Sequence, residues 1–300
     1  MLPANPEPDA RGRFPSWLHR NLPQGENLAL TASVMRAGSL HTVCEEAKCP
    51  NRFECWSNKT ATFLIMGKQC TRNCGFCSID FSKSPQPLEA LEPQHVAESV
   101  KALGLKHVVI TMVARDDLPD GGATHLVETV SVVRRENPGV TIELLTSDFN
   151  GNEEAWKIAL SSEPEIFNYN IETVRRLTPG VRHRATYDRT LQFLAHIKKD
   201  GRARYVKSGL MVGLGEGREE VEETLRELHH AGVSIVTIGQ YLQPHRQKLL
   251  VKSFVTPDEF EAYAEYGRKL GILYMHCGPF VRSSYNAKAL FESIEKSDRM

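Results

Sequence analysis

TATFLIMGKQCTRNCGFC, residues 60–77, joins an apolar run to three closely spaced cysteines. The run Thr60–Met66 has the length and the apolar content of a buried strand. Cys70, Cys74 and Cys77 follow this run directly, so we expect them on the loop at the carboxyl end of the strand. Because α/β barrels place their chemistry on such loops, the stretch predicts a barrel-like fold with a cysteine site at its open end.

The chain beyond this stretch alternates β-rich runs with longer helical patterns as far as residue 270, which indicates βα units and a parallel sheet. We expect further strands at His107–Met112, Thr141–Leu145, Ile166–Ile171, Tyr205–Val212 and Ile235–Ile238. We expect helices near 93–103, 122–136, 152–160, 187–199, 217–230 and 256–270. About six βα units fall short of the eight that close a full barrel. The predicted fold class is therefore α/β, a partial (β/α)6 TIM-like barrel.

The barrel is expected over residues 59–270, within a single structural unit. Residues 1–58 are interpreted as an N-terminal extension, in which a Pro-rich arm leads into a cluster-binding segment. The expected anchors of the arm are Trp17, Leu18 and Leu22. Residues 271–300 repeat no βα unit, and we expect them to fold back as a C-terminal extension.

The charge and hydropathy of the chain exclude several classes of protein. Lys+Arg and Asp+Glu are equal at 37 each, which disfavours a nucleic-acid partner, although a local basic patch for an acidic protein remains compatible with zero net charge. No apolar run reaches the length of about 18 residues that a membrane-spanning helix needs. The N-terminus lacks the patterns of a secretory signal and of a transit peptide, so we expect a cytoplasmic protein.

Six of the seven cysteines fall between Cys44 and Cys77, and this clustering in a chain of 300 residues predicts a metal site rather than a disulfide framework. Cys70, Cys74 and Cys77 can hold three irons of a 4Fe–4S cubane and leave the fourth iron open for an exchangeable ligand. The alternative is a structural zinc site. Zinc usually takes four closed ligands, and this triplet lacks an adjacent fourth.

A second triplet, Cys44, Cys49 and Cys55, precedes the first strand with the spacing C-x4-C-x5-C. Taken alone, this spacing is compatible with zinc, with a ferredoxin-like site or with buried thiols. The seventh cysteine, Cys277, lies far along the chain and is interpreted as a small buried thiol.

Several of these motifs resemble one family. The pattern C-x3-C-x-aromatic-C, with Phe76 as the aromatic residue, resembles the signature of radical S-adenosylmethionine enzymes. The run Cys44–Trp56 and the sequence Arg282-Ser283-Ser284-Tyr285 resemble the auxiliary-cluster motifs of lipoyl synthases within that class. The resemblance covers most of the chain and implies two 4Fe–4S clusters. It implies that the later triplet holds the radical-generating cluster, while the earlier triplet and a serine, here Ser284, hold the auxiliary cluster.

The resemblance also implies contacts with S-adenosylmethionine at residues near the expected strand ends. These residues are Phe76, Asn170, Glu172, Met211 and Gly213. Residues 115–117 follow the second expected strand and are candidates for substrate or cofactor contacts, with a capped, solvated loop as the alternative.

As the family is understood, the implied reaction is insertion of two sulfur atoms at C6 and C8 of a protein-bound octanoyl-lysine. The cluster held by Cys70, Cys74 and Cys77 generates the radical, and the cluster that Ser284 completes is consumed as the sulfur donor. The implied partners are an octanoylated lipoyl carrier domain, a ferredoxin- or flavodoxin-like reductant, and an iron–sulfur carrier that rebuilds the cluster. The alternatives are a biotin-synthase-like sulfur inserter, a radical enzyme whose auxiliary cluster only transfers electrons, or a non-enzymatic iron–sulfur carrier or scaffold. A carrier would not need the barrel.

Overall fold

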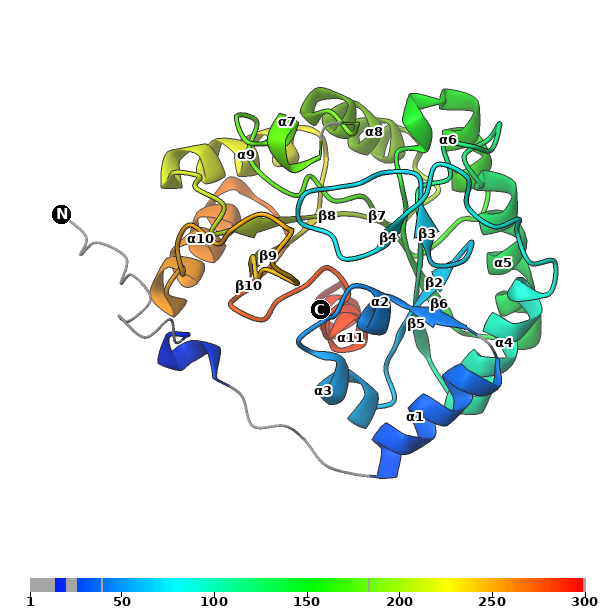
Figure 1. Ribbon diagram of the computed structural model, residues 1–300. Helices are drawn as coiled ribbons and strands as arrows, with labels where there is room; N and C mark the ends of the chain where they lie inside the picture. Colours follow the sequence, from blue (N-terminus) through cyan, green and yellow to red (C-terminus); the bar gives the residue numbers. More distant parts are fainter. Residues whose placement is uncertain (1–13, 20–25, 39, 183, 299–300) are drawn as a thin grey trace.

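The computed structural model describes residues 14–19, 26–38, 40–182 and 184–298, and its main feature is one curved sheet of eight strands (Figure 1). In spatial order the strands are β1 (His41–Thr42), β2 (Thr62–Ile65), β5 (His107–Met112), β6 (Thr141–Leu145), β7 (Ile166–Asn168), β8 (Tyr205–Val212), β9 (Ile235–Gln240) and β10 (Tyr274–Gly278). β1 is antiparallel to β2, and all the other pairs are parallel. In the part of the chain that the structure describes, no pairing joins β1 to β10. The expected open α/β barrel is confirmed.

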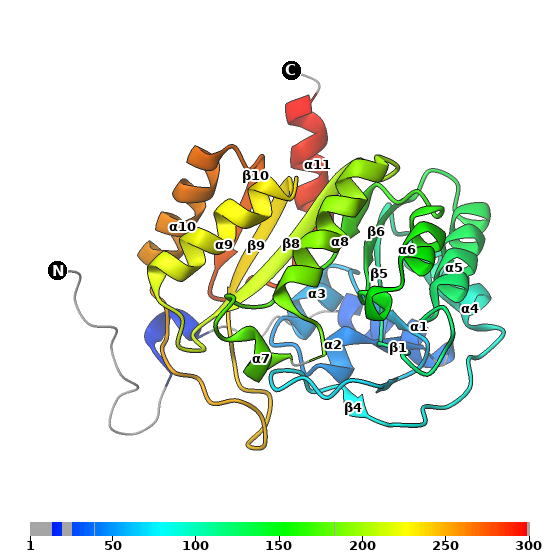
Figure 2. The same ribbon diagram turned by 90° about the horizontal axis from the view of Figure 1, so that it is seen from above.

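Helices cover the outer face of this sheet (Figures 1 and 2). They are α4 (Glu92–Leu103), α5 (Ala123–Glu136), α6 (Glu153–Leu160), α8 (Tyr187–Asp200), α9 (Arg218–His230) and α10 (Pro257–Leu270). Each begins and ends within one residue of its predicted position. The Thr256 hydroxyl caps α10 by accepting a hydrogen bond from the Glu259 amide. Among the described residues, no helix has the length and the apolar content to cross a membrane.

Two predictions about the ends of the chain are wrong. β10 follows α10 and pairs with β9, so one more strand joins the parallel sheet after residue 270, where no further unit was expected. The Pro-rich arm, in which no helix or strand was expected, contains η1 (Ser16–Leu18) and the helix α1 (Glu26–Ala37). Of the expected anchors, Leu18 is buried and Trp17 is half-buried, whereas Leu22 lies outside the described residues.

The terminal segments fill the inside of the open barrel. α2 (Val43–Glu46) and α3 (Arg52–Ser57) lie at one end, and α11 (Ala287–Asp298) lies within the ring of strands in Figure 1. Phe291 and Ile294 of α11 pack against residues of β7, β8 and β9 near the amino ends of those strands. This end of the barrel is therefore filled by α11, while the carboxyl ends of the strands are left for the site.

The remaining elements are short and lie in loops. They are β3 (Gln69–Cys70) and β4 (Asp80–Phe81), which pair with each other, η2 (Phe149–Gly151) and α7 (Thr178–Val181).

Candidate active site

The described residues enclose a cavity of about 830 Å³ at the carboxyl ends of the strands. The predicted site residues that line it are Cys44, Cys49, Cys55, Cys70, Cys74, Phe76, Cys77, Asn170, Glu172, Met211 and Ser284. Gly213 is outside the lining, and so is Cys277, whose burial raises the pKa of its thiol to about 12. The fold therefore brings both cysteine triplets and the serine into one space, although Ser284 lies more than 200 positions after the last of these six cysteines.

The loop of the later triplet is anchored to the ends of the neighbouring strands. The Thr71 hydroxyl donates a hydrogen bond to the carbonyl of Ala114, at 3.0 Å. The buried Arg72 guanidinium pairs with the carboxylates of Asp116, at 2.7 Å, and Asp148, at 2.6 Å. Such charge-assisted, partly bidentate pairs fix geometry as well as adding stability. The loop that carries Cys70, Cys74 and Cys77 is thus held from its inner side.

The outer side of this loop is held by two other segments. The Gly75 amide donates to the carbonyl of Val181 in α7, at 2.9 Å, and the Leu249 amide donates to the carbonyl of Gly75, at 3.0 Å. The Lys248 ammonium donates to the carbonyl of Cys74, at 3.1 Å. The cysteine loop therefore lies between α7 and the segment that joins β9 to α10.

The earlier triplet is placed by two short helices. Cys44 belongs to α2, Cys55 belongs to α3, and Cys49 lies in the turn between them. The Thr42 hydroxyl caps α2 by accepting a hydrogen bond from the Glu45 amide, at 3.2 Å. The turn then brings the three cysteines to the same wall of the cavity.

The thiols of each triplet influence one another. Burial raises the pKa of Cys44 to about 11, with a further contribution from Cys49. Burial and the neighbouring Cys77 raise the pKa of Cys74 to about 12. Among the described residues, no three His, Cys, Asp or Glu side chains are grouped as around a single metal ion. Two separate sets of soft sulfur donors, protonated at neutral pH unless a positive centre is present, fit iron–sulfur clusters.

Two glycines make room for the segment that carries Ser284, and a third lies beside it. A Cβ atom on Gly209 of β8 would lie 2.8 Å from the Ser283 hydroxyl, and one on Gly239 of β9 would lie 2.0 Å from the Val281 carbonyl oxygen. A Cβ atom on Gly278 of β10 would meet the Val281 side chain at 3.4 Å. That contact is an ordinary one, and we therefore name Gly209 and Gly239 alone the glycine shelf. Residues 281–284 lie against it because these two positions carry no side chain.

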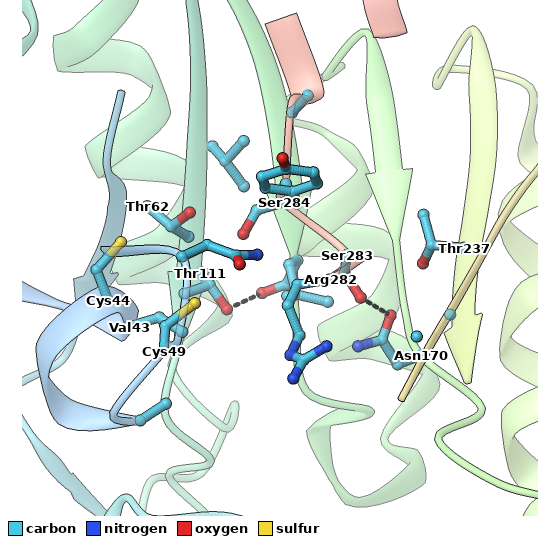
Figure 3. A pocket seen from close by; sticks show the side chains of 18 of the residues that line it. Val43, Cys44, Cys49, Thr62, Thr111, Asn170, Thr237, Arg282, Ser283 and Ser284 are labelled. Carbon is cyan, nitrogen blue, oxygen red and sulfur yellow. Dashed lines mark hydrogen bonds between the residues drawn. The ribbon is translucent and has the colours of Figure 1, made fainter. Parts of the chain in front are cut away.

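The two serines of this segment have different surroundings. The Ser283 hydroxyl donates a hydrogen bond to Asn170 Oδ1, at 2.8 Å (Figure 3). In Figure 3, Ser284 lies on the side of the cavity where Cys44 and Cys49 are. Among the described residues, none forms a hydrogen bond with the Ser284 hydroxyl.

The N-terminal and C-terminal segments are also tied to each other. The Asn51 side-chain amide donates to the carbonyl of Phe280, at 2.7 Å. The Tyr285 hydroxyl donates to the Glu54 carboxylate, at 2.8 Å. The wall of the cavity that carries the earlier triplet is therefore fixed to the segment that carries Ser284.

The wall opposite this triplet carries the predicted cofactor contacts. The Asn170 side-chain amide donates to the Glu172 carboxylate, at 3.1 Å, and the carbonyl of Asn170 accepts from Arg182, at 2.8 Å. Glu172 has a φ of 67°, and its burial raises the pKa of its carboxyl group. Strained backbone of this kind clusters at ligand sites.

Residues 115–117 do not line this cavity. Arg115 is buried and pairs with Asp117, at 2.8 Å, while Asp116 pairs with Arg72. Their side chains therefore hold the loops around the site in place. The sequence pattern does not predict these ion pairs.

Comparisons with known proteins agree with this geometry. The family description of the Radical SAM superfamily matches residues 64–228, and that of the N-terminal domain of lipoyl synthase matches residues 4–49. The chain is 64% identical over 294 residues to the lipoyl synthase of Protochlamydia amoebophila, and the match covers 96% of this chain and 91% of that protein. The chain belongs to the lipoyl synthase family. The lipoyl synthase of Chlamydia trachomatis serovar D is 51% identical over 293 residues, with 98% and 94% covered.

Solved structures support the fold of this lipoyl synthase family member. Methylornithine synthase superposes with a TM-score of 0.53 at 14% identity, and the match covers 84% of this chain and 78% of that one. The FeFe-hydrogenase maturase from Carboxydothermus hydrogenoformans gives a TM-score of 0.54 at 12% identity, with 78% and 67% covered. The family predicted from the cysteine and serine motifs is confirmed by the identity to the two lipoyl synthases. The chain is a radical S-adenosylmethionine enzyme, whose family uses 4Fe–4S clusters and S-adenosylmethionine.

Proposed function

We propose that this lipoyl synthase inserts two sulfur atoms, at C6 and C8 of an octanoyl chain on a lysine of a lipoyl carrier domain, and that it binds two 4Fe–4S clusters to do so. The observation that carries the proposal is the single cavity that both cysteine triplets and the segment of Ser284 line. In this reaction one group generates a radical on the substrate and a second group supplies sulfur. Both groups must therefore lie within reach of the same acyl chain.

Cys70, Cys74 and Cys77 would hold the first cluster. When bound, this cluster and S-adenosylmethionine supply a 5′-deoxyadenosyl radical, and the second cluster supplies sulfur. The ion pairs of Arg72 hold the loop on the ends of β5 and β6, so that the three thiols keep their positions through repeated turnovers.

Cys44, Cys49, Cys55 and Ser284 would hold the second cluster. The choice of Ser284 over Ser283 is supported by the hydrogen bond that already engages Ser283 with Asn170. A serine oxygen is a harder ligand than a thiolate, and iron in such clusters prefers sulfur. The iron held by the serine would therefore be the most weakly bound. Such weak binding suits a cluster that is consumed in the reaction.

Phe76, Asn170, Glu172 and Met211 would contact S-adenosylmethionine, and their position in the cavity lining supports this. Gly213 would act through the shape of the strand end. Its φ of 98° suits glycine, and a Cβ atom there would lie 2.1 Å from the side-chain amide of Gln240.

The proposed partners beyond the octanoylated carrier are a ferredoxin- or flavodoxin-like reductant and an iron–sulfur carrier that rebuilds the consumed cluster. The proposed setting is the cytoplasm. Unpaired, cluster-forming thiols are typical of such a reducing compartment.

The test is an anaerobic reaction of the reconstituted protein with S-adenosylmethionine, a strong reductant and an octanoyl-lysine peptide. Mass spectrometry would follow the peptide and 5′-deoxyadenosine. Cys74→Ala should abolish deoxyadenosine formation, whereas Cys49→Ala should keep it and stop sulfur insertion. Cys277→Ala is the matched control, because this thiol lies outside the cavity. Deoxyadenosine without sulfur on the peptide in the unchanged protein would instead favour an auxiliary cluster that only transfers electrons.

A further inference from the structure

The segment between β9 and α10 carries an uneven distribution of charge. Residues 241–252, which we name the cover loop, read YLQPHRQKLLVK and contain His245, Arg246, Lys248 and Lys252. No Asp or Glu occurs from residue 241 to residue 257. The segment therefore carries an excess of positive charge, although the whole chain has a formal net charge of zero.

The cover loop covers the outer side of the loop of the later cysteine triplet. It projects at the end of the barrel opposite α11 in Figure 2. Leu249 bonds to the backbone of Gly75, and Lys248 bonds to the carbonyl of Cys74 and to the side chain of Asn73. The cover loop thus lies directly between solvent and the proposed site of the first cluster.

The two halves of the cover loop face different surroundings. Its first residues, 241–244, line the cavity, whereas its four basic residues do not. Arg246 and Lys252 are exposed, and so is Leu250, with 62% of its surface accessible. The outer half of the cover loop therefore exposes its charges to solvent.

The cations of the cover loop have no acidic partner among the residues that the structure describes. Among the ion pairs of the described residues, none involves Arg246, Lys248 or Lys252. The nearby α7 region differs in this respect, since Arg175 pairs with Glu227 and Arg176 pairs with Glu220. The charges of the cover loop are therefore available to a partner.

We propose that the outer half of the cover loop is the docking surface for a small acidic one-electron donor protein of the flavodoxin type. The inference rests on the proposed function, which requires an electron at the first cluster. The inner side of the cysteine loop faces the cavity that cofactor and substrate fill, so an outside protein can approach that cluster on the covered side. In the transfer, the anionic flavin hydroquinone of the donor would lose one electron and become the neutral semiquinone without releasing a proton, and the oxidised cluster would gain that electron. Complementary charge would steer the encounter and lose effect as salt rises.

The octanoylated carrier domain is a different class of partner for the same surface. The structure favours the donor, because the basic residues lie outside the cavity lining that an octanoyl chain must enter. The experiment below separates the two.

The experiment measures the dissociation constant of purified oxidised flavodoxin for the reconstituted protein at low ionic strength. The variant is Arg246→Glu/Lys252→Glu, and Lys248 is left unchanged because it contacts the cysteine loop. The matched control is Lys101→Glu/Lys106→Glu, which makes the same change of charge on exposed residues near the amino end of β5. We expect the dissociation constant of the first variant to be at least tenfold larger and to depend less on salt concentration. The control variant should bind flavodoxin as the unchanged protein does.

A second readout is the rate of cluster reduction. Flavodoxin hydroquinone should reduce the cover-loop variant at least tenfold more slowly, while reduced methyl viologen, a small cation, should not be slowed. Equal dissociation constants for the two variants would overturn the proposal. A cover-loop variant that binds flavodoxin normally but turns over an octanoylated carrier domain slowly would assign the surface to the carrier and also overturn it. A failure of the proposed function would appear separately, as absence of sulfur insertion by the unchanged protein with dithionite.

Discussion

Replacing Gly239 by alanine tests how the glycine shelf positions the segment of Ser284. The new Cβ atom would lie 2.0 Å from the carbonyl oxygen of Val281, a distance that real Cβ atoms do not show. Gly239 has no left-handed backbone conformation, so alanine itself is not strained there. The carbonyl must therefore move away by about 1 Å, and Ser284 follows three residues later.

The size of the effect follows from this displacement. Overpacking of this kind costs about 1–3 kcal/mol of folding stability, which a protein of normal stability survives. A shift of about 1 Å at a reacting group can cost about a hundredfold in rate. We therefore expect a folded protein whose sulfur insertion falls by at least about tenfold, with deoxyadenosine formation nearly unchanged.

The assay compares sulfur added to an octanoyl-lysine peptide with deoxyadenosine formed, alongside iron content and the urea midpoint. Gly278→Ala is the matched control, because its new methyl group would touch the Val281 side chain at an ordinary 3.4 Å. If Gly239→Ala inserted sulfur within twofold of Gly278→Ala, the argument that the shelf positions the serine would be refuted.

Three further predictions concern stability, and urea unfolding checks each. Lys207→Met should cost about 3–5 kcal/mol, because it leaves the fully buried Glu143 carboxylate, now 2.8 Å from the ammonium, without its partner; an unchanged midpoint would contradict this. Burial lowers the pKa of His107 to about 4, below its unfolded value of about 6.5, so the unfolded state binds the extra proton and stability should fall by about 2 kcal/mol between pH 7 and pH 5. A His107→Phe variant should lose that slope. Thr256→Ala should cost about 1 kcal/mol by removing the cap of α10, whereas Thr256→Ser should cost less.

The sequence predicted the regular part of the barrel because each βα unit carries its own local signals. α10 is an example, since Thr256, Pro257 and Glu259 mark its start within four residues. The cysteine triplets are local in the same way. The spacing of Cys70, Cys74 and Cys77 and their position after a strand sufficed to expect a metal site at the open end of the barrel, whereas the role of the earlier triplet came from the family resemblance.

The strand β10 and the helix α1 were not predicted, although each has a local sequence pattern. β10 begins in an apolar run, Ile272 to Met275, after the Gly271 that ends α10, and this run is a strand pattern. α1 has Leu28, Thr31 and Met35 at helical spacing on its packed side, before Gly38. The N-terminal part was interpreted as a Pro-rich arm, and the part after residue 270 as an extension that repeats no βα unit.

The glycine shelf and the ion pairs of Arg72 could not be predicted from the sequence, because they depend on contacts between distant segments. Gly239 and Val281 meet because β9 and the C-terminal segment pack together, and no local pattern encodes a contact across 42 positions. Gln240, which bonds to the backbone of Ser253 and Val255, likewise acquires its role only in the folded barrel.

The contact between Asn51 and Phe280 has a consequence for biosynthesis. The two residues are 229 positions apart, and a ribosome that adds 5–20 residues per second needs roughly 10–50 s to pass from one to the other. Cys70 to Cys77 leave the ribosome almost together, so their loop is chemically complete early. The wall that carries Cys44 cannot contact its partner segment, which contains Phe280, until the last part of the chain has been synthesised. The direction of translation therefore sets the order in which the two cysteine sites are completed.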